Sequence, residues 1–151
     1  MEYRSILCPT DGTEISDAAL QHAAYLSKIT GAKVILLHVV EKWYHSAHLV
    51  TNSDEWQTIH EDWLNKGRST LVDEAAKLKE YGAVHIETIL RDGDASHEII
   101  ATAIERMASV VIMATHRYSP VGKIFIGSVT DRVAKKTPCP ILWVFPNLSN
   151  E

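Results

Sequence analysis

The sequence lacks the features of a secreted or membrane-inserted chain. No segment approaches the run of about 18 apolar residues that can span a bilayer. Residues 1–5 lead directly into a short apolar run, without the longer apolar region and cleavage site of a signal peptide. Cysteine is also scarce, and Cys8 and Cys139 fit neither a C-x-x-C motif nor zinc-ligand spacing. We therefore expect a cytoplasmic protein with two small, buried, reduced thiols.

A surplus of basic charge is missing as well. The net charge is -4 with histidine neutral, whereas domains that bind nucleic acids usually carry a surplus or a stripe of Lys and Arg. The largest basic cluster, Arg132, Lys135 and Lys136, has the spacing of a solvated helix face. We therefore expect no nucleic-acid partner and no membrane partner. The 46% hydrophobic and 23% charged residues are typical of one globular domain.

Strand and helix patterns alternate through residues 1–146. Apolar or alternating runs, typical of strands, are found at residues 4–8, 34–40, 84–90, 110–114 and 140–145. Helical spacing fills the intervals between them, with Ser16 as the expected cap of the first helix. Because this alternation demands right-handed crossovers, we predict an α/β fold: a single domain with a five-stranded parallel sheet and helices on both faces. Residues 147–151 are expected to form a flexible tail.

A parallel sheet also predicts where a ligand binds. In open parallel sheets, ligands lie beyond the carboxyl ends of the strands, near the point where the strand order reverses. Four segments reach that edge: residues 9–13, residues 39–41, an expected turn at residues 91–94, and the loop at residues 115–127. We therefore expect the functional residues to lie in these four segments.

Residues 114–128 carry a recognisable motif. Ala114-Thr115-His116-Arg117 is followed by nine residues and then by Gly127-Ser128. This segment resembles the motif G-x-x-G, nine residues, G-[ST] of the nucleotide-binding branch of the universal stress protein family. The segments at residues 6–12, 36–39 and 137–142 resemble the family's opening motif, its second strand and the entry into its last strand. The resemblance covers nearly the whole chain and implies a Rossmann-like fold of the adenine nucleotide alpha hydrolase type.

Two glycines of the family motif are replaced in this sequence, because Ala114 and Arg117 stand at the first two positions. Arg117 could fill the site, or it could offer its planar guanidinium to a phosphate in place of the backbone contact. His116 could also bind a phosphate when it is protonated. Gly127 and Ser128 open a helix whose free N–H groups suit an anion, although an ordinary helix cap would have the same sequence.

The resemblance assigns further nucleotide contacts. Asp11 would accept hydrogen bonds from the adenine or the ribose, Val39 would line the adenine pocket, and Gly93 would let its loop pass near the ribose. Each also has a plain structural interpretation, as a turn residue, a core residue and a turn glycine. The expected binding residues are Pro9, Thr10, Asp11, Val39, Gly93, Ala114, His116, Arg117, Gly127, Ser128, Val129 and Thr130. Ser128 and Thr130 could also help to hold Mg²⁺ on a bound triphosphate.

The sequence leaves three functions open. The first is a universal stress-type protein that binds ATP, ADP or AMP and acts as a regulatory or sensing dimer. The second is a relative without nucleotide binding that works as a dimeric interaction module. The third is a slow nucleotide hydrolase, although the chain has no P-loop, no G-x-G-x-x-G after the first strand, no G-x-S-x-G and no other catalytic constellation.

Two further expectations concern surfaces. A homodimer through the last strand, Pro140 to Phe145, is expected because an apolar edge strand invites pairing with another chain, and the family resemblance implies the same. Trp43, Trp56 and Trp63 are expected to pack the long second helix against the sheet or to cover an interface, which could bind an unidentified protein partner. His45, His48 and His60 lack the spacing of metal ligands, so no metal site is expected.

Overall fold

The sequence forms an alternating α/β structure around one parallel sheet. In the computed structural model, which describes residues 1–41, 54–115 and 127–146, the elements are β1 (Ser5–Pro9), α1 (Glu14–Thr30), β2 (Lys33–Glu41), α2 (Asp54–Glu80), β3 (His85–Gly93), α3 (Ala95–Glu105), β4 (Val110–Ala114), α4 (Ser128–Lys136) and β5 (Ile141–Val144). All paired strands are parallel, in the order β3-β2-β1-β4-β5. The predicted fold class is therefore confirmed.

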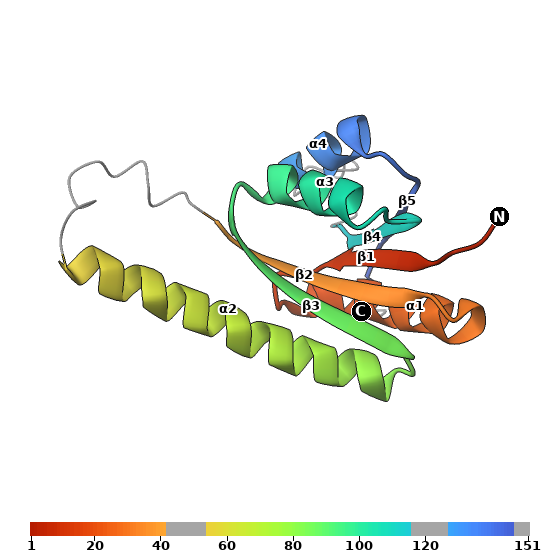
Figure 1. Ribbon diagram of the computed structural model, residues 1–151, viewed down its shortest axis with the longest axis horizontal. Coiled ribbons are helices and arrows are strands. Elements are labelled where there is room, and N and C mark those ends of the chain that lie inside the picture. The colour runs from red at the N-terminus through yellow and green to blue at the C-terminus, as the bar shows by residue number, and fades with distance from the viewer. Residues whose placement is uncertain (42–53, 116–126, 147–151) are drawn as a thin grey trace, which may run out of the picture.

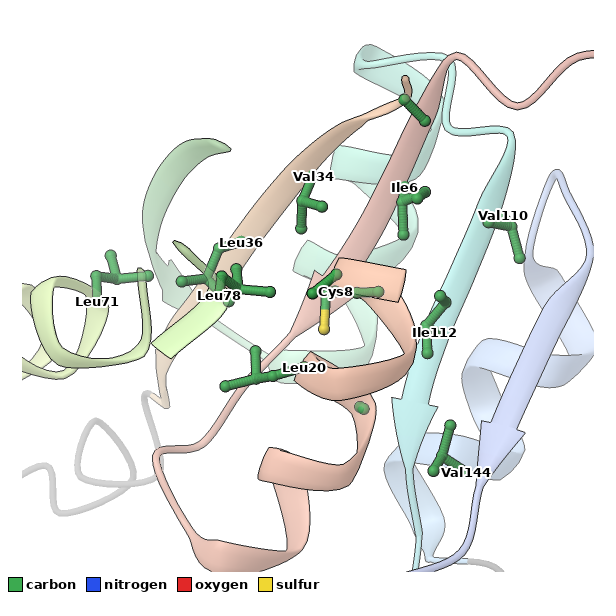
Figure 2. Packing of buried hydrophobic residues seen from close by; sticks show 14 residues of the cluster. Ile6, Cys8, Leu20, Val34, Leu36, Leu71, Leu78, Val110, Ile112 and Val144 are labelled. Atoms are coloured by element: carbon green, nitrogen blue, oxygen red, sulfur yellow. The ribbon is translucent and has the colours of Figure 1, made fainter. Parts of the chain in front are cut away.

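Two apolar layers hold the helices against the sheet. Figure 1 shows α1 and α2 on one face and α3 and α4 on the other. On the first face Ile6, Val34 and Leu36 pack with Leu20 of α1 and Leu78 of α2 (Figure 2). The alternate strand residues, such as Leu7, Ile35 and Leu37, pack with Ile99 of α3 on the second face. A one-residue slip of a strand would turn all its side chains to the opposite face of the sheet. Each aliphatic side chain that lost its burial would then cost about 1.5–3 kcal/mol of folding free energy.

The helix-to-strand connections at the amino edge of the sheet are short. They comprise residues 31–32, 81–84, 106–109 and 137–140. Backbone hydrogen bonds close the ends of all four helices. They run from Gly31 N–H to Ser27 O (2.8 Å), from Ala83 N–H to Leu78 O (3.0 Å), from Ala108 N–H to Ala103 O (2.9 Å) and from Thr137 N–H to Val133 O (2.8 Å). None of the helices in the described part of the chain combines the length and hydrophobicity needed to cross a bilayer.

Several element boundaries differ from the sequence prediction by one to three residues, and two of these differences concern capping and turn residues. The first helix begins at Glu14 with Thr13 at the N-cap, and Ser16 lies inside the helix, where its hydroxyl donates to Thr13 O at 2.8 Å. The prediction of a turn at residues 91–94 is also wrong for residues 91–93, because β3 continues to Gly93. Arg91, Asp92 and Gly93 pair in register with residues 39–41 of β2. A nine-residue ladder supplies hydrogen bonds that outweigh the turn preference of Asp-Gly.

The structure describes two of the three tryptophans expected on the sheet or at an interface. Trp56 and Trp63 are half-buried on α2, and α2 lies along β2 and β3. Neither residue belongs to the two apolar clusters between helices and sheet, so the choice between packing on the sheet and covering an interface stays a prediction. Trp43 lies outside the described residues.

Asp94 alone remains as the connection from β3 to α3, and it caps that helix. Its Oδ1 accepts hydrogen bonds from the Ser96 hydroxyl at 2.6 Å and from the His97 N–H at 2.9 Å. These two hydrogen bonds lower the pKa of Asp94 below its ordinary value of 3.8, and the bond from Ser96 has the larger effect. The cap is therefore at full strength above that ordinary value and weakens as the pH falls through the lower folded value.

We expect Asp94→Ala to lower the free energy of unfolding by about 1 kcal/mol at pH 7, because α3 loses its N-cap acceptor. Asp94→Asn should retain most of the stability, since an amide oxygen also caps a helix. Urea unfolding followed by circular dichroism measures both. Equal losses in the two variants would show that charge, rather than capping, is the source of the effect.

Candidate functional site

A cleft of about 480 Å³ opens beyond the carboxyl ends of β1, β2 and β4, beside α3 and α4. The chain leaves β1 toward β2 on one side and later returns to β4 on the other, so this is the point where the strand order reverses. Ligands of open parallel sheets bind at such a point. The cleft is lined by Pro9, Thr10, Asp11, Ile15, Ser16, Leu37, Val39, Glu41, Ala95, Ile99, Met113, Ala114, Val129 and Thr130.

The cleft has an apolar interior and a polar rim. Leu37 and Val39 of β2, Ile99 of α3 and Met113 of β4 supply aliphatic surface. The carboxylates of Asp11 and Glu41 stand on the side of β1 and β2. The first turn of α4 borders the opposite side with Val129 and Thr130. An apolar slot with a few polar groups at its ends suits a flat heterocycle that carries polar substituents.

Many of the residues singled out from the sequence line this cleft. They are Pro9, Thr10, Asp11, Val39, Ala114, Val129 and Thr130. Gly93, Gly127 and Ser128 are not among its lining residues. His116 and Arg117, which the family resemblance implicates in phosphate binding, lie outside the described residues.

Gly93 is the buried last residue of β3 and lies close to α3, which begins two residues later. A Cβ there would lie 2.9 Å from Oε1 of Glu98, the end of a flexible side chain that could move away. The expectation that Gly93 approaches a ribose stays a prediction.

Gly127 is different, because neither its conformation nor its described neighbours require a glycine. It is the N-cap of α4 with φ −56° and no side-chain capping hydrogen bond. Among the described residues, an added Cβ would have only Thr130 Oγ1 within 4 Å, at 3.9 Å. The missing side chain leaves the backbone open next to Ser128, at the positive end of a nine-residue helix.

Asp11 makes the turn interaction typical of an Asp before a Gly. Its Oδ1 accepts hydrogen bonds from the Thr13 N–H at 3.0 Å and from the Thr13 hydroxyl at 2.6 Å. Gly12 follows with φ +78°, a conformation that favours glycine. The turn interpretation of Asp11 is thus observed, and the same contacts fix the direction of its carboxylate at the rim of the cleft.

The expected binding residues omit half of the cleft lining, namely Ile15, Ser16, Leu37, Glu41, Ala95, Ile99 and Met113, although Glu41 lies within the expected segment at residues 39–41. A signal for two of these was present, because Leu37 and Glu41 lie two residues before and after Val39 and so share its face of β2. The residues of α1 and α3 could be found only from the tertiary packing of those helices.

His60 has a partner that its sequence context did not suggest. Its Nε2 lies 2.6 Å from Oδ2 of Asp92, and the pair links α2 to the carboxyl end of β3. Within the described ranges, no three His, Cys, Asp or Glu side chains are placed to hold a metal ion. His45 and His48 lie outside those ranges.

Comparison with known proteins assigns the family. The model of the universal stress protein family matches residues 2–144. The universal stress protein MJ0531 of Methanocaldococcus jannaschii is 31% identical over 142 residues, a match that covers 94% of this chain and 82% of that protein. The chain therefore belongs to the universal stress protein family.

Solved structures of the family share the fold. The structure of MJ0577, also from Methanocaldococcus jannaschii, superposes with a TM-score of 0.80 at 24% identity and covers 99% of this chain and 100% of that one. A universal stress protein in complex with cAMP gives 0.69 at 19% identity, covering 96% and 98%. The universal stress protein from Archaeoglobus fulgidus in complex with dAMP gives 0.68 at 20% identity, covering 95% and 98%.

The two thiols differ in exposure, which corrects the expectation that both are buried. Cys8 is fully buried in β1 between the strands and α1 (Figure 2), whereas Cys139 is half-buried. Burial, with a smaller contribution from the Glu74 carboxylate, raises the pKa of the Cys8 thiol to about 12. Because the thiolate is the reactive form, Cys8 is protected twice, by inaccessibility and by protonation.

We expect the native protein at pH 8 to show one reactive thiol toward a disulfide reagent, Cys139, with Cys8 reacting only after unfolding. Absorbance of the released thiol gives the count with and without urea. In Cys139→Ser the native count should fall to none. A native count of two would contradict the buried position of Cys8.

Proposed function

We propose that this universal stress protein binds an adenine nucleotide (ATP, ADP or AMP) in the cleft and acts as a regulatory or sensing dimer. The observation that carries the proposal is the position and shape of the cleft. It lies at the reversal of strand order, and its volume falls in the range of about 300–1,000 Å³ that is typical of small-molecule sites. Two structures of family members hold cAMP and dAMP.

The charges around the cleft favour one orientation of the nucleotide. The base would occupy the apolar slot next to Val39 and Ile99, with Asp11 accepting a hydrogen bond from the adenine or ribose. Phosphates would avoid the carboxylates of Asp11 and Glu41 and lie at the first turn of α4, where free N–H groups and the helix dipole attract an anion. Gly127 supports this orientation, because among the described residues only Thr130 Oγ1 comes within 4 Å of the position that a Cβ would take.

The alanine at the first position of the altered motif is compatible with this site. Ala114 is half-buried and its methyl group forms part of the cleft wall. A bound triphosphate would bring Mg²⁺ within the reach of hydroxyls in the first turn of α4, and we propose Ser128 and Thr130 for that role.

The dimer would form through β5, which is an edge strand of the sheet. Leu142 on this strand is 37% exposed although it is a large aliphatic residue, and Trp143 beside it is half-buried. Pairing of two β5 edges would satisfy the free backbone groups and cover this apolar surface.

We expect ATP with Mg²⁺ to raise the melting temperature of the protein by about 5 °C or more at a hundredfold excess over Kd. Ala95→Trp should abolish the shift, because its indole fills the cleft from the first turn of α3. The matched control is Ala101→Trp, half-buried on the same helix but in the surface groove between α3 and α4. If neither co-purifying nucleotide nor a shift is found with the wild-type protein, the interaction module without nucleotide is the better account.

We expect the wild-type protein to be a dimer at micromolar concentration by light scattering, and Leu142→Glu to be a monomer because its charge cannot be buried between two edges. Ile104→Glu, at an exposed aliphatic position on α3, is the control and should leave the dimer intact. Dissociation by the control variant alone would place the interface on α3 instead.

A further inference from the structure

Glu74 of α2 is a buried carboxylate, whereas the other buried polar residues in the described part of the chain are Ser and Thr. Its side chain is 3% exposed, and among the described residues it is the only charged one that is buried. Burying a carboxylate costs free energy unless it is paired and hydrogen-bonded. Oε1 accepts a hydrogen bond from Lys77 Nζ at 2.9 Å, and Oε2 accepts one from the Thr10 hydroxyl at 3.0 Å.

Thr10 stands between Glu74 and the cleft. It lines the cleft, and its backbone is held from β2: its N–H donates to Leu37 O at 2.8 Å, and its carbonyl oxygen lies 2.8 Å from Nδ1 of His38. Its Oγ1 also accepts the Gly12 N–H at 3.1 Å and lies 3.0 Å from the Ser16 hydroxyl. Every polar atom of Thr10 is therefore engaged.

The hydroxyl proton of Thr10 decides how this network is arranged. A hydroxyl has one proton and two lone pairs. The Thr10 proton goes to Glu74, the Thr10 Oγ1 accepts the Gly12 N–H, and the Ser16 hydroxyl donates its own proton to Thr13 O. Without an acceptor at position 74, the Thr10 proton would turn to the Ser16 oxygen 3.0 Å away, and this rotation would move the lone pair that faces the Gly12 N–H. Glu74 thus selects one of two hydrogen-bond arrangements in the loop at residues 10–13.

A second contact from α2 supports the same loop. Thr70 lies one helical turn before Glu74, on the same face of α2. A Cβ at Gly12 would lie 2.8 Å from Thr70 Cγ2, so the loop passes close against the helix. The turn that α2 supports in this way contains Asp11, whose carboxylate stands on the rim of the cleft.

We infer that Glu74 is a positioning residue of the nucleotide site: through the Thr10 hydroxyl it fixes the loop that carries Asp11, although it does not itself line the cleft. The inference rests on the proposed nucleotide binding. Removing one partner of an ion pair is costly when the other charge stays buried, but Lys77 is 41% exposed and can return to solvent when Glu74 is lost. Replacing the buried carboxylate with an apolar side chain therefore also removes its desolvation cost. A positioning role therefore predicts that ligand affinity and stability respond differently when Glu74 is replaced.

The test measures the Kd for ATP by calorimetry and the melting temperature without ligand. Glu74→Leu should weaken ATP binding about tenfold while the melting temperature is unchanged or higher. Glu74→Gln should bind within about twofold of the wild type, because its amide oxygen can still accept from Thr10. Asp73→Asn, at the exposed neighbouring carboxylate on α2, is the matched control and should change neither quantity.

Thr10→Val should reproduce the loss caused by Glu74→Leu, and the double variant should lose no more than either single one, since both remove the same bond. If the wild type binds ATP and Glu74→Leu binds as well as Asp73→Asn, the inference fails and the proposed function stands. A parallel fall of affinity and melting temperature in Glu74→Leu, without rescue by Gln, would show a merely structural role and also overturn it. If the wild type binds no nucleotide, the proposed function fails and the inference with it.

Discussion

The structure depends on the burial of β1 between two neighbours and two helical layers. Ile6, Leu7 and Cys8 have no exposed surface, and the strand pairs with β2 on one edge and β4 on the other. The chain must leave this central strand in one direction and come back on the other side. The carboxyl end of β1 is therefore where the strand order reverses, and the cleft lies there.

Much of this arrangement was predictable from the sequence, because it follows from short-range patterns. The apolar run at Val110–Ala114 and the helical spacing of Ser128–Lys136 have the bounds that the structure shows. The end of β3 was not predictable, because Asp92 and Gly93 prefer turns and are held in the strand only by their ladder with β2. The first-helix cap was misplaced by three residues, since Thr13 and Ser16 are equally good capping types and both precede apolar spacing.

The site was predictable in its location and only partly in its composition. The sheet rule and the resemblance to the family together identify the loop after β1 and the start of α4. Neither argument predicts that residues such as Ile15 and Ile99 line the cleft, because their helical spacing also fits ordinary core positions. The burial of Glu74 was also not predictable, because an acidic residue on a long polar helix is expected in solvent. Only the tertiary contact with Thr10 reveals its buried environment.

The short connections at the amino edge have a consequence for how such a protein can diverge or be redesigned. They join helix to strand in two to four residues. Insertions or deletions there would therefore displace the paired strands directly. The opposite edge carries the two longest connections, residues 42–53 and 115–127. Changes of length or sequence in these two connections do not shift the register of the paired strands. Exchanging them between relatives should therefore preserve the fold.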